Sequence, residues 1–101
     1  MAALQILIGL IISKIEEVHD YIQVVFSDGT TLSIFNTYVY DGELVTGIEG
    51  RKVKSVEESA DRVLIIFDNG KAISVGLKDG DYNGPEAMVL KQEGKSPVVW
   101  S

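Results

Sequence analysis

Phe26–Ile34 reads FSDGTTLSI and Phe67–Val75 reads FDNGKAISV, so nearly the same phrase occurs twice in the chain. The second copy starts 41 positions after the first, and this offset holds without gaps over residues 9–34 and 50–75. Self-similarity at a fixed offset indicates a repeated supersecondary unit. We therefore predict a single domain, residues 1–101, that contains two equivalent units.

Each unit is predicted to be a three-stranded meander. In the first unit, residues 21–26 and 30–34 alternate apolar and polar side chains, which is typical of half-buried strands. The Asp-Gly of Ser27–Gly29 lies between them, and it favours a tight hairpin because glycine accepts a positive φ. Another extended segment, Leu10–Val18, precedes the hairpin, and the second unit repeats it at Arg51–Glu58.

Further strands are expected at both ends of the chain. The apolar run Leu4–Ile12 is interpreted as a buried strand. At the other end, Ala87–Leu90 and Val98–Trp100 flank a turn-rich stretch, which predicts a hairpin over residues 86–101. No window of helical length has an apolar stripe of period 3.6. The predicted fold is all-β or nearly so, with two antiparallel meanders forming a sandwich or a partly open barrel.

Composition and charge restrict the classes of partner. The 101 residues carry a formal net charge of −6 and no cysteine. The whole negative excess falls in residues 1–50, where Lys14 is the only basic residue. Nucleic-acid binding requires basic residues that neutralise phosphates, so we expect no nucleic-acid partner and favour a basic protein surface. The run Leu4–Ile12 is shorter than the roughly 20 apolar residues of a membrane span, and we predict a cytoplasmic protein without a membrane partner.

The sequence shows no constellation that would support catalysis. Its one histidine, His19, has no cysteine or activated serine to assist, and the pair Glu16–Glu17 would point to opposite faces of a strand. Asp79–Gly84, DGDYNG, begins like a calcium loop, but the position of the closing glutamate is Leu90. We expect no enzyme activity, no catalytic residue, no cofactor and no metal. A small-ligand or metal-binding module that uses Asp79, Asp81 and Asn83 is a third interpretation.

The segment that joins the two units, Phe35–Gly50, combines aromatic and acidic residues and has no positive charge. Aromatic side chains supply rigid contact area at interfaces, and acidic residues around them steer a basic partner. The predicted partner-binding residues are Tyr38, Tyr40, Asp41, Glu43, Glu49 and, from the first hairpin, Asp28. The alternative interpretation is that both tyrosines are half-buried residues of a sheet.

The chain resembles the small acidic immunity proteins of bacterial toxin–immunity systems, particularly those of contact-dependent growth inhibition. The resemblance rests on FSDGTTLSI, on the tyrosine-rich acidic linker, and on a tail that reads YNGPEAMVL (Tyr82–Leu90) and VVW (Val98–Trp100). It implies a cytoplasmic inhibitor that binds a toxin domain and blocks its active site.

Two functions follow from the sequence. The first is a non-catalytic binding protein that occludes a basic, nuclease-like toxin domain. The alternative is a homo-oligomeric structural or accessory β-domain, in which the tyrosine-rich segment or a strand edge pairs with its own copy.

Overall fold

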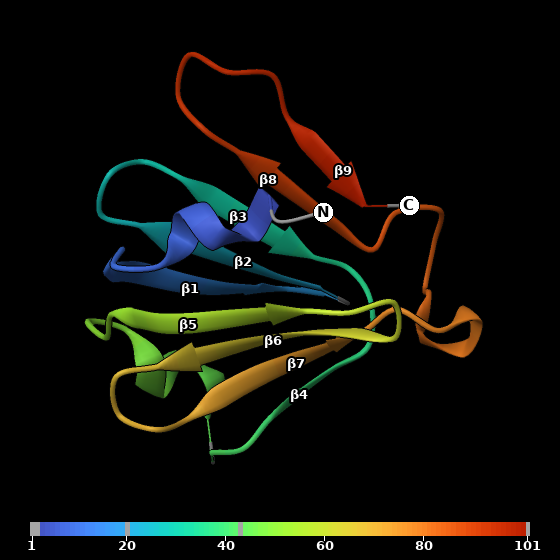
Figure 1. The fold of residues 1–101 in the computed structure, drawn as a ribbon, viewed down its shortest axis with the longest axis horizontal. Coiled ribbons are helices and arrows are strands. Elements are labelled where there is room, and N and C mark those ends of the chain that lie inside the picture. The colour runs from blue at the N-terminus through green and yellow to red at the C-terminus, as the bar shows by residue number, and fades with distance from the viewer. Residues whose placement is uncertain (1–2, 20, 43, 101) are drawn as a thin grey trace.

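The computed structural model describes residues 3–19, 21–42 and 44–100, and its strands form two antiparallel sheets (Figure 1). The five-stranded sheet has the order β1 (Ile12–Val18), β2 (Tyr21–Phe26), β3 (Thr31–Ile34), β8 (Met88–Lys91) and β9 (Val98–Trp100). The four-stranded sheet has the order β4 (Tyr38–Tyr40), β7 (Ala72–Gly76), β6 (Arg62–Phe67) and β5 (Val53–Glu58). The two sheets pack together without closing into a barrel, which confirms the predicted nearly all-β sandwich.

Both predicted meanders are present, and their hairpins have matching hydrogen bonds. Phe26 N donates to Thr30 O at 2.8 Å, and Phe67 N donates to Lys71 O at 2.9 Å. Gly29 has a φ of 91° and the corresponding Gly70 has a φ of 83°. Glycine is the residue that accepts this conformation without strain, so the repeated Asp-Gly and Asn-Gly pairs do set these turns.

The predicted strand over Leu4–Ile12 is wrong in its first half. Residues Ala3–Leu7 form a 3-10 helix, η1, and β1 begins only at Ile12. Leu4 and Leu7 are fully buried. A spacing of three residues places both on one face of a 3-10 helix, whereas an extended chain would have pointed them to opposite sides.

A second 3-10 helix, η2 (Val45–Ile48), matches η1 at the same offset, so the structural repeat begins earlier than residues 9 and 50. Each helix packs on the first strand of the other unit, η1 on β5 and η2 on β1. The hydrogen bonds between the units are also exchanged in pairs. Gly9 N donates to Val53 O at 2.8 Å, and the equivalent Gly50 N donates to Ile12 O at 2.7 Å. The two units are therefore related by an approximate two-fold axis, close to the isolated bridge between Ile11 and Lys52.

Each unit passes its next strand to the other sheet. After β3 the chain crosses to form β4 beside β7, and after β7 it crosses to form β8 beside β3. Tyr38 pairs with Val75 of β7, and Met88 pairs with Ile34 of β3, so β4 and β8 occupy equivalent positions. The symmetry stops there. The predicted hairpin of the tail adds β9 next to β8, and no described strand lies at the matching position next to β4.

The core is one continuous cluster to which both sheets contribute. Among the described residues, no helix is long and apolar enough to cross a membrane. Helical structure in the described chain is limited to η1, η2 and η3 (Asp79–Asp81).

Candidate functional site: the β4 edge and the adjacent groove

The tyrosine-rich segment forms the outermost strand of the four-stranded sheet (Figure 1). Tyr38 and Tyr40 are half-buried and pack against the core. Val39 between them points to the opposite face and is 65% exposed. The segment therefore presents a valine and its main chain to the surface, while the tyrosine rings cover the core.

Backbone hydrogen bonds determine which main-chain groups of β4 face away from the sheet. At its two ends, Thr37 O accepts a bond from β7 at 3.0 Å and Asp41 N donates one to β7 at 3.3 Å. Residues that bond to the same neighbour alternate along an antiparallel pair, so Val39 also bonds to β7. The N–H and C=O groups of Tyr38 and Tyr40 consequently point to the open side of β4. Within the described chain, no strand pairs with them there.

The three described acids of the predicted site each hold a backbone N–H in place. Asp28 Oδ1 accepts from Thr30 N at 2.9 Å, and Asp41 Oδ1 accepts from Ala72 N at 2.8 Å. Glu49 Oε2 accepts from Ile15 N at 2.8 Å. These carboxylates therefore stabilise a turn, the end of β4 and the free side of β1. Glu43, also in the predicted site, lies outside the described residues.

Asp28 and Asp41 lie next to strands of different sheets. Asp28 belongs to the turn between β2 and β3, in the five-stranded sheet. Asp41 follows β4 in the four-stranded sheet, directly after Tyr40. The structure thus groups Tyr38 and Tyr40 on β4 with Asp41 directly after it, and leaves Asp28 and Glu49 on other segments.

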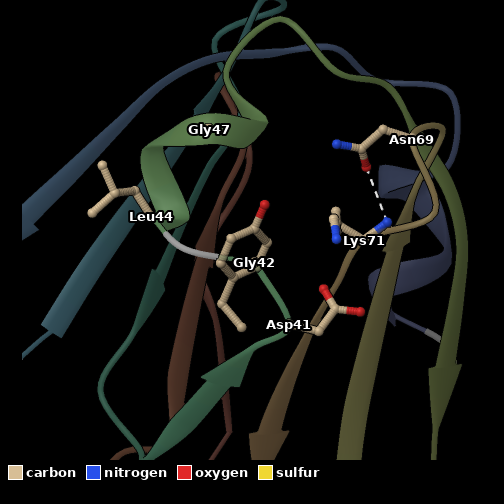
Figure 2. A pocket seen from close by; sticks show the side chains of 7 residues that line it. Asp41, Gly42, Leu44, Gly47, Asn69 and Lys71 are labelled. Atoms are coloured by element: carbon tan, nitrogen blue, oxygen red, sulfur yellow. Dashed lines mark hydrogen bonds between the residues drawn. The ribbon is translucent and has the colours of Figure 1, made fainter.

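A groove of about 470 Å³ opens where β4 ends. Its lining residues come from the end of β4, from the segment that follows it up to η2, and from the turn between β6 and β7: Tyr40, Asp41, Gly42, Leu44, Gly47, Asn69 and Lys71. Figure 2 shows Leu44 and Gly47 on one side of the groove, and Asn69 and Lys71 on the other. Leu44 is 70% exposed and is the most exposed large hydrophobic residue among those described. The groove therefore combines an unburied apolar side chain with one acidic and one basic group.

The ring of Tyr40 supports the segment that borders this groove. A Cβ atom added at Gly42 would lie 2.6 Å from Tyr40 Cζ and 2.7 Å from Tyr40 Oη. A Cβ added at Gly47 would lie 3.9 Å from the same hydroxyl. The ring thus fills the space directly beneath Gly42, and only glycine fits there without a movement of the ring.

Tyr38, at the other end of β4, lies in a different electrostatic environment. Burial raises the pKa of its phenol, and the nearby Glu17 carboxylate raises this pKa further. Both effects disfavour the phenolate. The phenol of Tyr38 therefore stays protonated at a higher pH than a solvent-exposed tyrosine.

The distribution of acidic residues in the folded molecule differs from their distribution along the sequence, where the negative excess lies in the first half. The two units interleave, so the acidic residues of both halves meet at the end of the sandwich where the chain crosses between sheets. The described acids at or next to this end are Glu17, Glu58, Asp61, Asp79, Asp81 and Glu86, and the basic residues there are Arg62 and Lys78. The groove lies at the opposite end, where acidic and basic residues are more evenly mixed.

The other candidate residues take structural positions. His19 is exposed in the turn between β1 and β2, with a φ of 49°. Asp81 Oδ2 accepts from Lys78 N at 3.2 Å, and Asn83 Nδ2 donates to Phe35 O at 2.9 Å. No group of three or more potential His, Cys, Asp or Glu metal ligands occurs among the described residues.

Comparison of the chain with protein-family models, with curated protein sequences and with solved structures finds no match. The site is therefore defined by its geometry alone. The sequence indicated Tyr40 and Asp41, but not Leu44, Asn69 or Lys71. The repeat alignment contained a signal for two of these three, because Asn69 and Lys71 belong to the second copy of the opening hairpin.

Proposed function

We propose that the chain is a non-catalytic binding protein that docks a basic protein partner at the groove next to β4. In this proposal the partner is a toxin domain, and the chain acts as its immunity protein by covering the toxin's active site. The observation that carries the proposal is the apolar residue Leu44, which is 70% exposed and lines the groove together with Asp41.

The exposure of Leu44 supports a protein partner. A large apolar side chain that is mostly in water stabilises a complex when a partner covers it, because apolar surface is then removed from water. The groove is shallow and open between two segments, which suits a protein surface better than a small molecule that must be largely enclosed.

The charge of the chain supports a basic partner. With a net charge of −6, the chain attracts a positively charged protein over distances comparable to the Debye length, about 8 Å at physiological salt. This net charge would raise the rate of encounter with that partner, while contacts at Leu44 would set the lifetime of the complex.

Copurification from the native host tests this function. A tagged chain is expected to retain a basic protein in a stoichiometric complex, and Leu44→Lys is expected to lose it. Val99→Lys is the matched control, because Val99 is an exposed valine on β9 outside the groove.

A growth assay then separates an inhibitor from an inert binder. The retained protein should stop growth when it is expressed alone, and coexpression of the chain should restore growth. Recovery of the chain without a partner, or of a partner that is harmless when expressed alone, would contradict the proposed function.

A further inference from the structure

We infer that two copies of this chain associate through β4, whose open side pairs antiparallel with β4 of the second copy. This association would make one continuous sheet from the two four-stranded sheets. It does not depend on the basic partner, because it uses the strand edge and leaves Leu44 to the groove.

The internal two-fold symmetry indicates which kind of strand fits at the position next to β4. In the five-stranded sheet, the equivalent strand β8 is covered by β9, with Val89 opposite Val99. Equivalent positions in β4 and β8 differ by 50 in number, as the pairs Tyr38–Val75 and Met88–Ile34 show, so Val89 corresponds to Val39. The molecule therefore fills this position on one side with a strand whose central residue is valine, and no strand of the described residues fills it on the other.

The sequence of β4 matches the strand that fills the equivalent position. β9 reads Val98-Val99-Trp100, with an exposed valine between two half-buried, bulky side chains. β4 reads Tyr38-Val39-Tyr40, with the same order of exposure. A second β4 is thus the segment of this chain that most closely reproduces the geometry of β9.

β4 is also complementary to itself. Tyr-Val-Tyr is the same in both directions, so antiparallel pairing about Val39 places Val39 opposite Val39 and Tyr38 opposite Tyr40 of the second copy. The outward N–H and C=O groups of both tyrosines would then form four hydrogen bonds across the axis. The next residues place Thr37 opposite Asp41 of the second copy, so no like charges face each other.

Edge strands usually carry features that prevent such pairing, and β4 has few of them. Lysine, proline and β-bulges are the common ones, and none occurs in β4. The free sides of β1 and β5 are protected instead by side chains, since Glu49 accepts from Ile15 N and Gln5 Nε2 donates to Val56 O. The shortness of β4 limits the contact, so we expect a weak dimer that forms at about 0.1–1 mM protein.

Substitution of Val39 by a charged residue tests the dimer. Its side chain lies on the outer face and is 65% exposed, so lysine or glutamate there leaves the core unchanged. In sedimentation equilibrium, the wild-type chain should associate over the stated range, whereas V39K and V39E should each remain monomeric because like charges would meet at the axis. An equimolar mixture of V39K and V39E should associate again.

The matched control is V99K, which places the same charge on the outer face of β9. V99K should associate like the wild-type chain. A wild-type chain that is monomeric at 1 mM would overturn the inference, as would V39K or V39E alone that associates normally, or a mixture that does not associate. Loss of association in V99K would also overturn it, since that result would assign the contact to β9. Binding of a basic partner is measured separately, through Leu44→Lys, so each hypothesis can fail without the other.

Discussion

Gly42→Ala tests the role of the Tyr40 ring as the support of the groove. The new Cβ would meet the ring at 2.6–2.7 Å from Cζ and Oη, which is closer than such atoms approach in proteins. The backbone at Gly42 lies outside the left-handed region, so the cost comes from packing alone. Overpacking of this kind costs about 1–3 kcal/mol. With a urea dependence of about 1–3 kcal/mol per molar for a small domain, the unfolding midpoint should fall by about 1 M.

A double-mutant cycle identifies the ring as the cause. Leu90 occupies the position in β8 that Tyr40 occupies in β4, so Tyr40→Leu is the replacement that the fold itself provides. In the Tyr40→Leu background, Gly42→Ala should cost less than about 0.5 kcal/mol, because the two changes are coupled through direct contact. Gly47→Ala, whose Cβ would lie 3.9 Å from the hydroxyl, should change stability by less than about 0.5 kcal/mol in either background. Equal losses for Gly42→Ala in both backgrounds would refute the assignment.

Three further changes test the rest of the fold. Because the pKa of Tyr38 is raised in the folded state, the protonated phenol contributes stability that is complete below the unfolded pKa of about 10 and is lost as the pH rises through the folded value. Tyr38→Phe should remove this loss of stability at alkaline pH. Glu17→Gln should reduce it, as measured by unfolding over a range of pH. Gly70→Ala should cost about 1–2 kcal/mol because φ is 83° with open space around it, and Gly80→Ala, without a positive φ, serves as its control in the same denaturation assay. Ile65→Val should lower the free energy of unfolding by about 0.5–1.5 kcal/mol, and a larger loss would mean that the core cannot relax around the missing methyl group.

The hairpins could be predicted from the sequence because the forces that set them are local. Alternation over Tyr21–Phe26 and a glycine with positive φ are properties of neighbouring residues, and both copies show them. The 3-10 helix at Ala3–Leu7 could not be predicted from its apolar content, since a short apolar run suits a strand equally well. The spacing of Leu4 and Leu7, repeated at Val45 and Ile48, was the available signal.

The candidate site depended on features that a linear sequence does not show. Tyr40 and Asp41 were identified by their residue types, but the groove also requires the turn of Asn69 and Lys71, which the sheet order brings to the same end. The placement of β4 in the sheet of the other unit depends on tertiary contacts and has no local signal in the sequence. For the same reason, the sequence did not show that the acidic residues of both halves meet at the crossover end and not at the groove.

The exchanged packing of η1 and η2 has a consequence for how the chain folds. The first unit has its strands and its hairpin before residue 35, but η2, which covers β1, begins only at Val45, and β8, which extends its sheet, only at Met88. Contacts between such distant segments must form before the apolar faces are covered, and they slow folding because loop closure is required first. A nascent chain of which only the first unit has left the ribosome therefore exposes an uncovered apolar sheet. The chain is most prone to aggregate during this interval of synthesis.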